Sequence, residues 1–190
     1  MRFQKLFVAI PVPKEHHGIV LDSEGNFSTG NETGVRWVRP EQLHLTVKFL
    51  GEIENTRLHT ACELMAEQCA ELSAFEIAIS GLGTFPPAKR PRVLWAGVTD
   101  GEEQLRVLHQ RLDEAFLELG VPAEGRTFRP HLTLARIEKS ADAEAVAEFV
   151  TQQTEATDFR FVAQKIVLFE SEKVGRYYQY EPVAEVKLQS

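Results

Sequence analysis

"HLTVKFLG" (residues 44–51) and "HLTLARI" (residues 131–137) share one pattern, His-Leu-Thr followed by an apolar residue, and lie 87 residues apart. Alternate residues of a strand face the same side, so the His and Thr of each copy point one way and the apolar residues point the other. Each copy therefore predicts a strand with a polar pair on one face and a core pair on the opposite face. If the two copies pack about a pseudo-twofold axis, their polar pairs meet across one groove.

A second pair of segments has the same offset. A shift of 87 residues places "LFVAI" (6–10) on "VLWAG" (93–97), with Ala9 on Ala96. Each half then reads as a strand, a helical segment, the His-x-Thr strand and a helix. Two matches at one offset predict a duplicated unit.

The remaining segments predict a mixed α+β chain. Further strands are expected from alternating or β-branched runs at residues 5–10, 35–38, 75–85 and 93–98, with two more across 158–188. Helices are expected from apolar residues at helical spacing over 55–72, after Asp100, and after Ser140. Asp100 with Glu103 resembles a capping box, and Ser140 can cap the third of these helices. The Gly- and Asn-rich stretch 22–34 and the proline-rich stretch 85–92 read as loops.

Composition and charge narrow the class of protein. The chain has 190 residues, of which 43% are hydrophobic, and a formal net charge of −7. An acidic chain is a poor candidate for sequence-independent binding to long nucleic acid, and we expect its few basic clusters to be mostly solvated surface. No apolar run approaches the roughly 20 residues that span a bilayer. We expect a cytosolic protein without a membrane partner, with Cys62 and Cys69 reduced because two helical turns separate them.

The paired histidines predict acid–base chemistry. Imidazole titrates near neutral pH, so one ring can act as a base while the other acts as an acid. His44 and His131, with the hydroxyls of Thr46 and Thr133 between them, suit in-line displacement at phosphorus. One ring deprotonates the attacking group and the other protonates the departing oxygen. Arg136 can neutralise charge on the phosphoryl oxygens, because a guanidinium matches their geometry.

Two other interpretations remain open. The two histidines could bind zinc, but no Asp, Glu or Cys stands at ligand spacing near either motif, and zinc usually takes three or four protein ligands. The second alternative, considered together with the resemblance described below, is a binding module that captures phosphorylated nucleotide or RNA ends without turnover. Paired histidines favour an enzyme, because binding alone does not require an acid and a base. His59 and His109 lie in expected helices and read as solvated.

Nearly the whole chain resembles the RNA 2′,3′-cyclic phosphodiesterases, also called 2′–5′ RNA ligases or LigT-like proteins, of the two-histidine phosphoesterase superfamily. The segments that carry the resemblance are "KLFVAIPVP" (5–13), "VRWVRPEQLHLTVKFLG" (35–51), "RPRVLWAGV" (90–98), "FRPHLTLARI" (128–137) and "IVLFESEKVGRYYQY" (166–180). The resemblance implies one α+β domain over residues 1–190. Its two intertwined, pseudo-symmetric lobes would each have an antiparallel sheet, with helices outside and a groove between them.

The resemblance also implies an activity and its residues. It implies hydrolysis of a terminal 2′,3′-cyclic phosphate to a 2′-phosphate, without metal or cofactor, and with reversible 2′–5′ ligation as the same chemistry reversed. We expect the protein to be a monomer. The substrates would be RNA ends or nucleotides with a cyclic phosphate. His44 would donate a proton to the departing 3′-oxygen and His131 would activate water. Thr46, Thr133 and Arg136 would hold the phosphate, and Phe49 would stack on the terminal base.

The position of Phe49 and Arg136 sets a geometric condition. Each lies five residues beyond its histidine, so a regular strand would point it to the opposite face. Both can reach the groove only if their strands bulge or end there. Gly51 makes such a bulge plausible in the first copy, and nothing comparable supports one in the second.

Overall fold

The structure is a computed structural model that describes residues 2–27, 34–87, 90–152, 158–175 and 177–190. Within these residues, antiparallel pairing joins nine strands into one sheet in the order β7-β4-β5-β6-β3-β1-β8-β9, and β2 pairs with β6 beside this path. The strands are β1 (Phe3–Pro11), β2 (Val35–Trp37), β3 (His44–Glu54), β4 (Phe75–Phe85), β5 (Val93–Asp100), β6 (His131–Ile137), β7 (Phe159–Ala163), β8 (Lys165–Val174) and β9 (Tyr177–Lys187).

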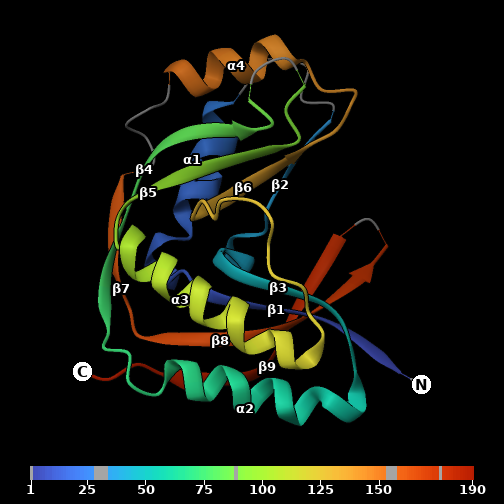
Figure 1. The fold of residues 1–190 in the computed structure, drawn as a ribbon. Helices are drawn as coiled ribbons and strands as arrows, with labels where there is room; N and C mark the ends of the chain where they lie inside the picture. The colour runs from blue at the N-terminus through green and yellow to red at the C-terminus, as the bar shows by residue number, and fades with distance from the viewer. Residues whose placement is uncertain (1, 28–33, 88–89, 153–157, 176) are drawn as a thin grey trace.

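The sheet has two halves that meet at the His-x-Thr strands. β3, β1, β8 and β9 form one half, and β6, β5, β4 and β7 form the other. β3 and β6 pair at a single residue, Leu45 opposite Leu132. Both strands lie in the middle of the molecule, as Figure 1 shows. The narrow join therefore brings the first residues of the two strands, His44 and His131, to the same place between the halves.

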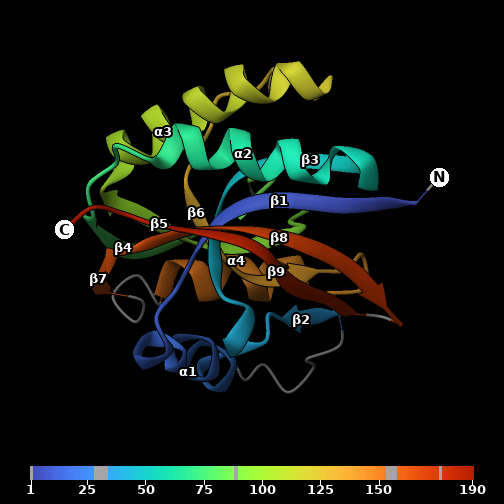
Figure 2. The same cartoon turned by 90° about the horizontal axis from the view of Figure 1, so that it is seen from below.

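Helices cover the sheet on both sides. They are α1 (Gly18–Asn26), α2 (Leu58–Cys69), α3 (Glu102–Ala115) and α4 (Ala143–Gln152), with short 3₁₀ turns at Lys14–His16, Pro40–Gln42, Asn55–Arg57 and Phe116–Leu119. α2 and α3 lie side by side on one side of the strands, and α1 lies on the other side (Figure 2). The apolar face expected for α3 is confirmed, since Leu105, Leu108 and Leu112 are fully buried. None of the described helices is long and apolar enough to cross a membrane.

The expected α+β fold with antiparallel sheets is confirmed, while several local predictions are wrong. Residues 158–188 contain three strands instead of two, because β7 and β8 are separated by Gln164 alone and join different halves of the sheet. α1 extends to Asn26 into the stretch expected to be a loop, and residues 28–33 of that stretch lie outside the described residues.

Both predicted helix caps are also wrong. α3 begins after Gly101, whose φ of 80° favours glycine and whose side-chain position is closed by the Glu76 carbonyl oxygen, 2.6 Å from an added Cβ. The cap of α4 is Asp142, since its Oδ1 accepts hydrogen bonds from the backbone N–H groups of Glu144 and Ala145 at 2.9 and 3.2 Å. Ser140 lies two residues before this cap.

Candidate active site

Both His-x-Thr strands contain a bulge immediately after the threonine. In β3, Thr46 lies opposite Ala9 and Lys48 lies opposite Val8, so Val47 is the extra residue. Two consecutive side chains, Val47 and Lys48, therefore point into the interior, and the next one returns to the face of His44. The condition on Phe49 is met in this way. Gly51 lies beyond Phe49, at a second irregularity, so it is not the residue that turns Phe49 into the groove.

The second His-x-Thr strand, β6, contains the same kind of bulge, and no glycine is involved. Thr133 lies opposite Trp95 and Ala135 lies opposite Leu94, which leaves Leu134 as the extra residue. The alternation of exposure is identical in the two strands over seven residues: half-buried, buried, half-buried, buried, buried, exposed, buried. The bulge places Arg136 on the face of His131 and Thr133.

One groove of about 720 Å³ gathers all six side chains expected from the sequence. Its walls include His44, Thr46 and Phe49 from β3 together with His131, Thr133 and Arg136 from β6. The Phe49 side chain remains 59% exposed. We call this space the central groove. A flat apolar ring and a guanidinium thus stand at equivalent positions of the two strands, on either side of the paired histidines.

The strand partners correct the offset of the apparent repeat. Leu45 lies opposite Ile10, whereas its counterpart Leu132 lies opposite Ala96. Ile10, rather than Ala9, therefore has the structural position of Ala96. The halves are related by 87 residues in their His-x-Thr strands and by 86 in the strands that pair with them.

The same backbone contact orients both catalytic candidates. Nδ1 of His44 lies 2.7 Å from the carbonyl oxygen of Gln42, and Nδ1 of His131 lies 2.8 Å from that of Arg129. A carbonyl oxygen can only accept, so each ring carries its proton on Nδ1 when it is neutral. Nε2 of each ring is then the atom that can accept a proton or, in the imidazolium, donate one. The two motifs thus present equivalent nitrogens to one groove.

Burial lowers the pKa of both rings. The pKa of His44 falls to about 4, because burial disfavours the imidazolium and the charges of Arg136 and His131 repel it, although the Gln42 carbonyl acts in the opposite direction. The pKa of His131 is also lowered by burial, against the effect of the Arg129 carbonyl. In the free protein both rings are therefore mainly neutral at pH 7.

Several side chains of this site were not predicted from the sequence. Tyr180 of β9 hydrogen-bonds Arg136 and meets the His44 ring edge-on at 5.2 Å, and burial raises the pKa of its hydroxyl. Phe7 of β1 packs on His44 with ring centroids 5.0 Å apart. Arg36 of β2, which pairs with Glu138 at 3.0 Å, lies opposite Arg136 and adds a second cation to the groove wall. Tyr180 falls in the segment 166–180 that carries the family resemblance, but no pattern there singles it out, and β2 is too short to predict the position of Arg36.

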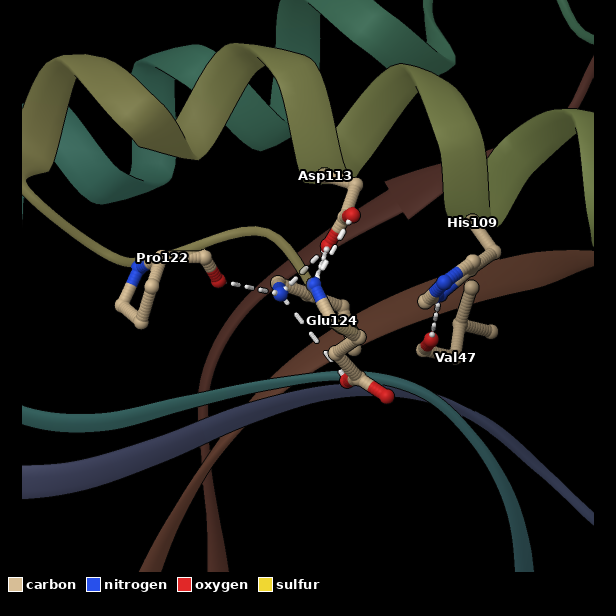
Figure 3. Close-up of polar contacts among 6 residues, drawn as sticks. Val47, His109, Asp113, Pro122 and Glu124 are labelled. Atoms are coloured by element: carbon tan, nitrogen blue, oxygen red, sulfur yellow. Dashed lines mark hydrogen bonds and ion pairs between the residues drawn. The ribbon is translucent and has the colours of Figure 1, made fainter. Parts of the chain in front are cut away.

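A buried polar cluster supports the bulge of β3. The prediction that His109 is solvated is wrong, because its ring is buried and its Nδ1 lies 2.8 Å from the carbonyl oxygen of the bulged Val47. Nζ of Lys48, fully buried, pairs with Asp113 and donates to the carbonyl oxygen of Pro122 at 3.2 Å. Figure 3 shows His109 and Asp113 pointing from α3 toward β3. The cluster ties the bulge to a helix and to the segment that precedes β6.

Among the residues that the structure describes, the side chains around the histidines do not form a metal site. Across the described part of the chain, no group of three His, Cys, Asp or Glu side chains is placed to hold a metal ion. The donor groups nearest the histidines are hydroxyls, guanidiniums and aromatic rings. These groups suit an anion better than a cation.

Comparison with known families gives one match over most of the chain. Residues 29–175 match the 2'-5' RNA ligase superfamily. A protein of Geobacillus stearothermophilus named RNA 2',3'-cyclic phosphodiesterase is 35% identical over 72% of this chain, and the match spans 43% of that protein's length. A protein of the same name from Aquifex aeolicus is 35% identical over 60% of this chain and 61% of its own. A third, from Methanocaldococcus jannaschii, is 27% identical over 95% of this chain and 99% of its own.

Solved structures share the fold over the full length. A crystal structure of a phosphoesterase aligns with a TM-score of 0.82 at 24% identity, covering 100% of both chains. The structure of E. coli LigT complexed with 3'-AMP aligns with a TM-score of 0.81 at 22% identity, again over 100% of both chains. At these identities the likeness shows the fold alone.

Proposed function

Because the chain belongs to the 2'-5' RNA ligase superfamily, we propose that it hydrolyses the terminal 2′,3′-cyclic phosphate of RNA or of nucleotides to a 2′-phosphate, without a metal ion. The observation that carries the proposal is the pair of equivalently held imidazoles in the central groove. Relatives named RNA 2',3'-cyclic phosphodiesterase support the substrate class. A monomer acting in the cytosol remains the prediction from the sequence.

The mechanism follows from the two Nε2 atoms. Nε2 of His131 takes a proton from water, and the water oxygen forms a bond to phosphorus. The bond from phosphorus to the 3′-oxygen breaks in line with the attack, and His44 in its imidazolium form gives its proton to that oxygen. The 2′-ester bond stays intact, so the product is a 2′-phosphate with a free 3′-hydroxyl.

Five other groove residues have binding or positioning roles in this proposal. The Thr46 and Thr133 hydroxyls donate hydrogen bonds to the non-bridging phosphoryl oxygens, and Arg136 neutralises their charge. Tyr180, hydrogen-bonded to Arg136, helps to hold the guanidinium in place. The exposed ring of Phe49 offers a flat face on which the terminal base can stack.

The proposal is tested with a short RNA that ends in a 2′,3′-cyclic phosphate, incubated with the protein in excess EDTA. The expected product is the 2′-phosphate, a chain with a free 3′-hydroxyl. ³¹P NMR distinguishes it from the 3′-phosphate. Formation of the 3′-phosphate would mean that the 2′-oxygen is the leaving group. Activity that EDTA abolishes and zinc restores would overturn the metal-free mechanism.

A further inference from the structure

The two His-x-Thr strands share very little backbone pairing. Among the described residues, β3 and β6 pair at Leu45 and Leu132 alone, and further along β6 the short strand β2 takes the place of β3. The sheet therefore fixes the alignment of the two strands only weakly. Contacts from outside the sheet must set how the side chains of β3 stand relative to those of β6.

His109 of α3 makes one such contact with β3. Its ring is buried, and its Nδ1 donates to the carbonyl oxygen of Val47 at 2.8 Å (Figure 3). Val47 is the extra residue of the β3 bulge, where the regular pairing with β1 is interrupted. A buried backbone carbonyl needs a donor, and His109 supplies it. Because this bulge turns Phe49 into the central groove, the hydrogen bond of His109 secures the place of Phe49.

The face of the same ring contacts the segment that leads into β6. Phe128 stacks on His109 with ring centroids 4.2 Å apart and planes 7° from parallel. Phe128 directly precedes Arg129, whose carbonyl oxygen accepts from Nδ1 of His131 at 2.8 Å. None of the helices and strands includes residues 120–130, so side-chain contacts have to hold that carbonyl in place.

We propose that His109 is a positioning residue that aligns the two His-x-Thr motifs across the central groove. The edge of its ring holds the bulge that places Phe49, and its face holds the segment that orients His131. His109 is not part of the wall of the central groove, so it acts only through these two residues. The inference rests on the proposed function, which gives Phe49 and His131 their roles.

The two contacts of His109 can be removed one at a time. His109→Phe keeps a flat ring against Phe128 and removes the donor to the Val47 carbonyl. His109→Asn keeps an amide N–H close to the position of Nδ1 and removes the ring that stacks on Phe128. A positioning role predicts different kinetic effects for these two variants, whereas a general loss of stability predicts none that depends on the contact removed.

His109→Phe should weaken recognition of the base. The KM for 2′,3′-cyclic AMP should rise about tenfold, the size expected when one base–aromatic stack is weakened, with little change in kcat. The KM for ribose 2′,3′-cyclic phosphate, which has no base, should stay unchanged. In a Phe49→Ala background, His109→Phe should raise the KM for cyclic AMP no further.

His109→Asn should weaken the chemical step instead. Its kcat should fall roughly tenfold or more on both substrates, because misplacing a catalytic group by about 1 Å can cost about 10²-fold. Phe128→Leu removes the same stack without altering α3 and should cause the same loss. Side-chain ¹⁵N NMR should show His131 protonated at Nδ1 in the unmodified protein and in His109→Phe, and a mixture of tautomers in His109→Asn and Phe128→Leu.

Met65→Ala is the control for lost stability. Met65 is fully buried in α2, so its truncation should lower the urea midpoint of unfolding and leave KM and kcat unchanged. If both His109 variants show the kinetics of this control, or if each changes KM and kcat alike, His109 does not position the motifs. If the His109 variants do not fold, an unchanged kcat in Phe128→Leu overturns the proposal.

The NMR measurement keeps this inference separate from the proposed function. If the unmodified protein hydrolyses neither substrate, the proposed function itself fails. The His131 ring then still tests the role of His109, since a tautomer that stays at Nδ1 in both His109→Asn and Phe128→Leu would show that the stack does not orient it.

Discussion

His44 and His131 are equivalent in their hydrogen bonds but not in their surroundings. Each ring donates from Nδ1 to the carbonyl oxygen two residues before it. Of the two rings, His44 is the one whose pKa is lowered by the nearby charge of Arg136. It also packs against Phe7 and Tyr180. A bound phosphodiester anion would oppose these effects, because a nearby negative charge favours the imidazolium. Binding of the substrate therefore raises the pKa of His44, the ring proposed as the acid, and favours its protonated form.

The first prediction concerns pH. The ratio kcat/KM reports the free protein, in which the pKa of His44 is about 4 and that of His131 is below 6.5. Activity requires one ring protonated and the other neutral, so kcat/KM should be bell-shaped with its maximum below pH 6.5. The alkaline limb of kcat, which reports the complex, should lie at higher pH because the substrate anion raises the pKa of the acid. A kcat/KM that rises steadily to pH 8 would contradict the prediction that both histidines have lowered pKa values in the free protein.

The second prediction assigns the acid and the base. The limbs of a pH profile belong to the coupled pair, so they cannot assign the roles. An aryl phosphodiester has a leaving oxygen that needs little protonation. With this substrate, His44→Ala should lose much less activity than His131→Ala, under conditions where chemistry is shown to limit the rate. Equal losses would mean that the assignment lacks support, and a larger loss in His44→Ala would reverse it.

At the scale of elements, β3 and β6 work through their bulges. A strand that kept strict alternation would bury Phe49 and Arg136 and expose the next residue. The sequence predicts the His-x-Thr faces well, because a period of two over four residues needs no knowledge of the partner strand. It does not predict the bulge at Leu134, because a bulge is a property of the pairing with β5 and no glycine marks it.

Two other predictions from the sequence were wrong for the same physical reason. His109 follows Leu108 on α3 and reads as solvated, since its hydrogen-bond partner, Val47, is 62 residues away. The break between β7 and β8 falls at Gln164, which is not a typical turn residue, because the chain passes there from one half of the sheet to the other. Local patterns identify elements, and contacts between distant segments decide how those elements bend and end.

The third prediction tests the buried cluster behind β3. In Lys48→Met the partly buried carboxylate of Asp113 loses its cation, and the expected loss in the free energy of unfolding is about 3 kcal/mol. Lys48→Met combined with Asp113→Leu should recover part of this loss, since no unpaired charge remains. Urea unfolding measures both. Arg106→Met, which breaks the exposed pair with Glu102, is the control and should cost under about 0.5 kcal/mol. A Lys48→Met protein as stable as this control would show that the cluster is not a support.

At the scale of the whole molecule, one half of the sheet is built from both ends of the chain, and the strands of the other half lie between them in the sequence. β8 and β9, from the C-terminal end, complete the half that contains β1 and β3, and β2 crosses to pair with β6 (Figure 1). We propose on this basis that residues 1–190 form one domain of two intertwined lobes that arose from a duplicated unit. The site depends on both lobes, because His44 comes from one and His131 from the other.

The most direct test of paired acid–base catalysis is turnover of a 2′,3′-cyclic-phosphate RNA by His44→Ala and by His131→Ala. Each variant should lose roughly 10²–10⁴-fold in kcat, the effect of removing a general acid or base. Binding of the 2′-phosphate product, measured on the same preparations, should weaken much less, which separates lost chemistry from lost folding. If either variant keeps turnover near that of the unmodified protein, the two histidines do not act as a pair.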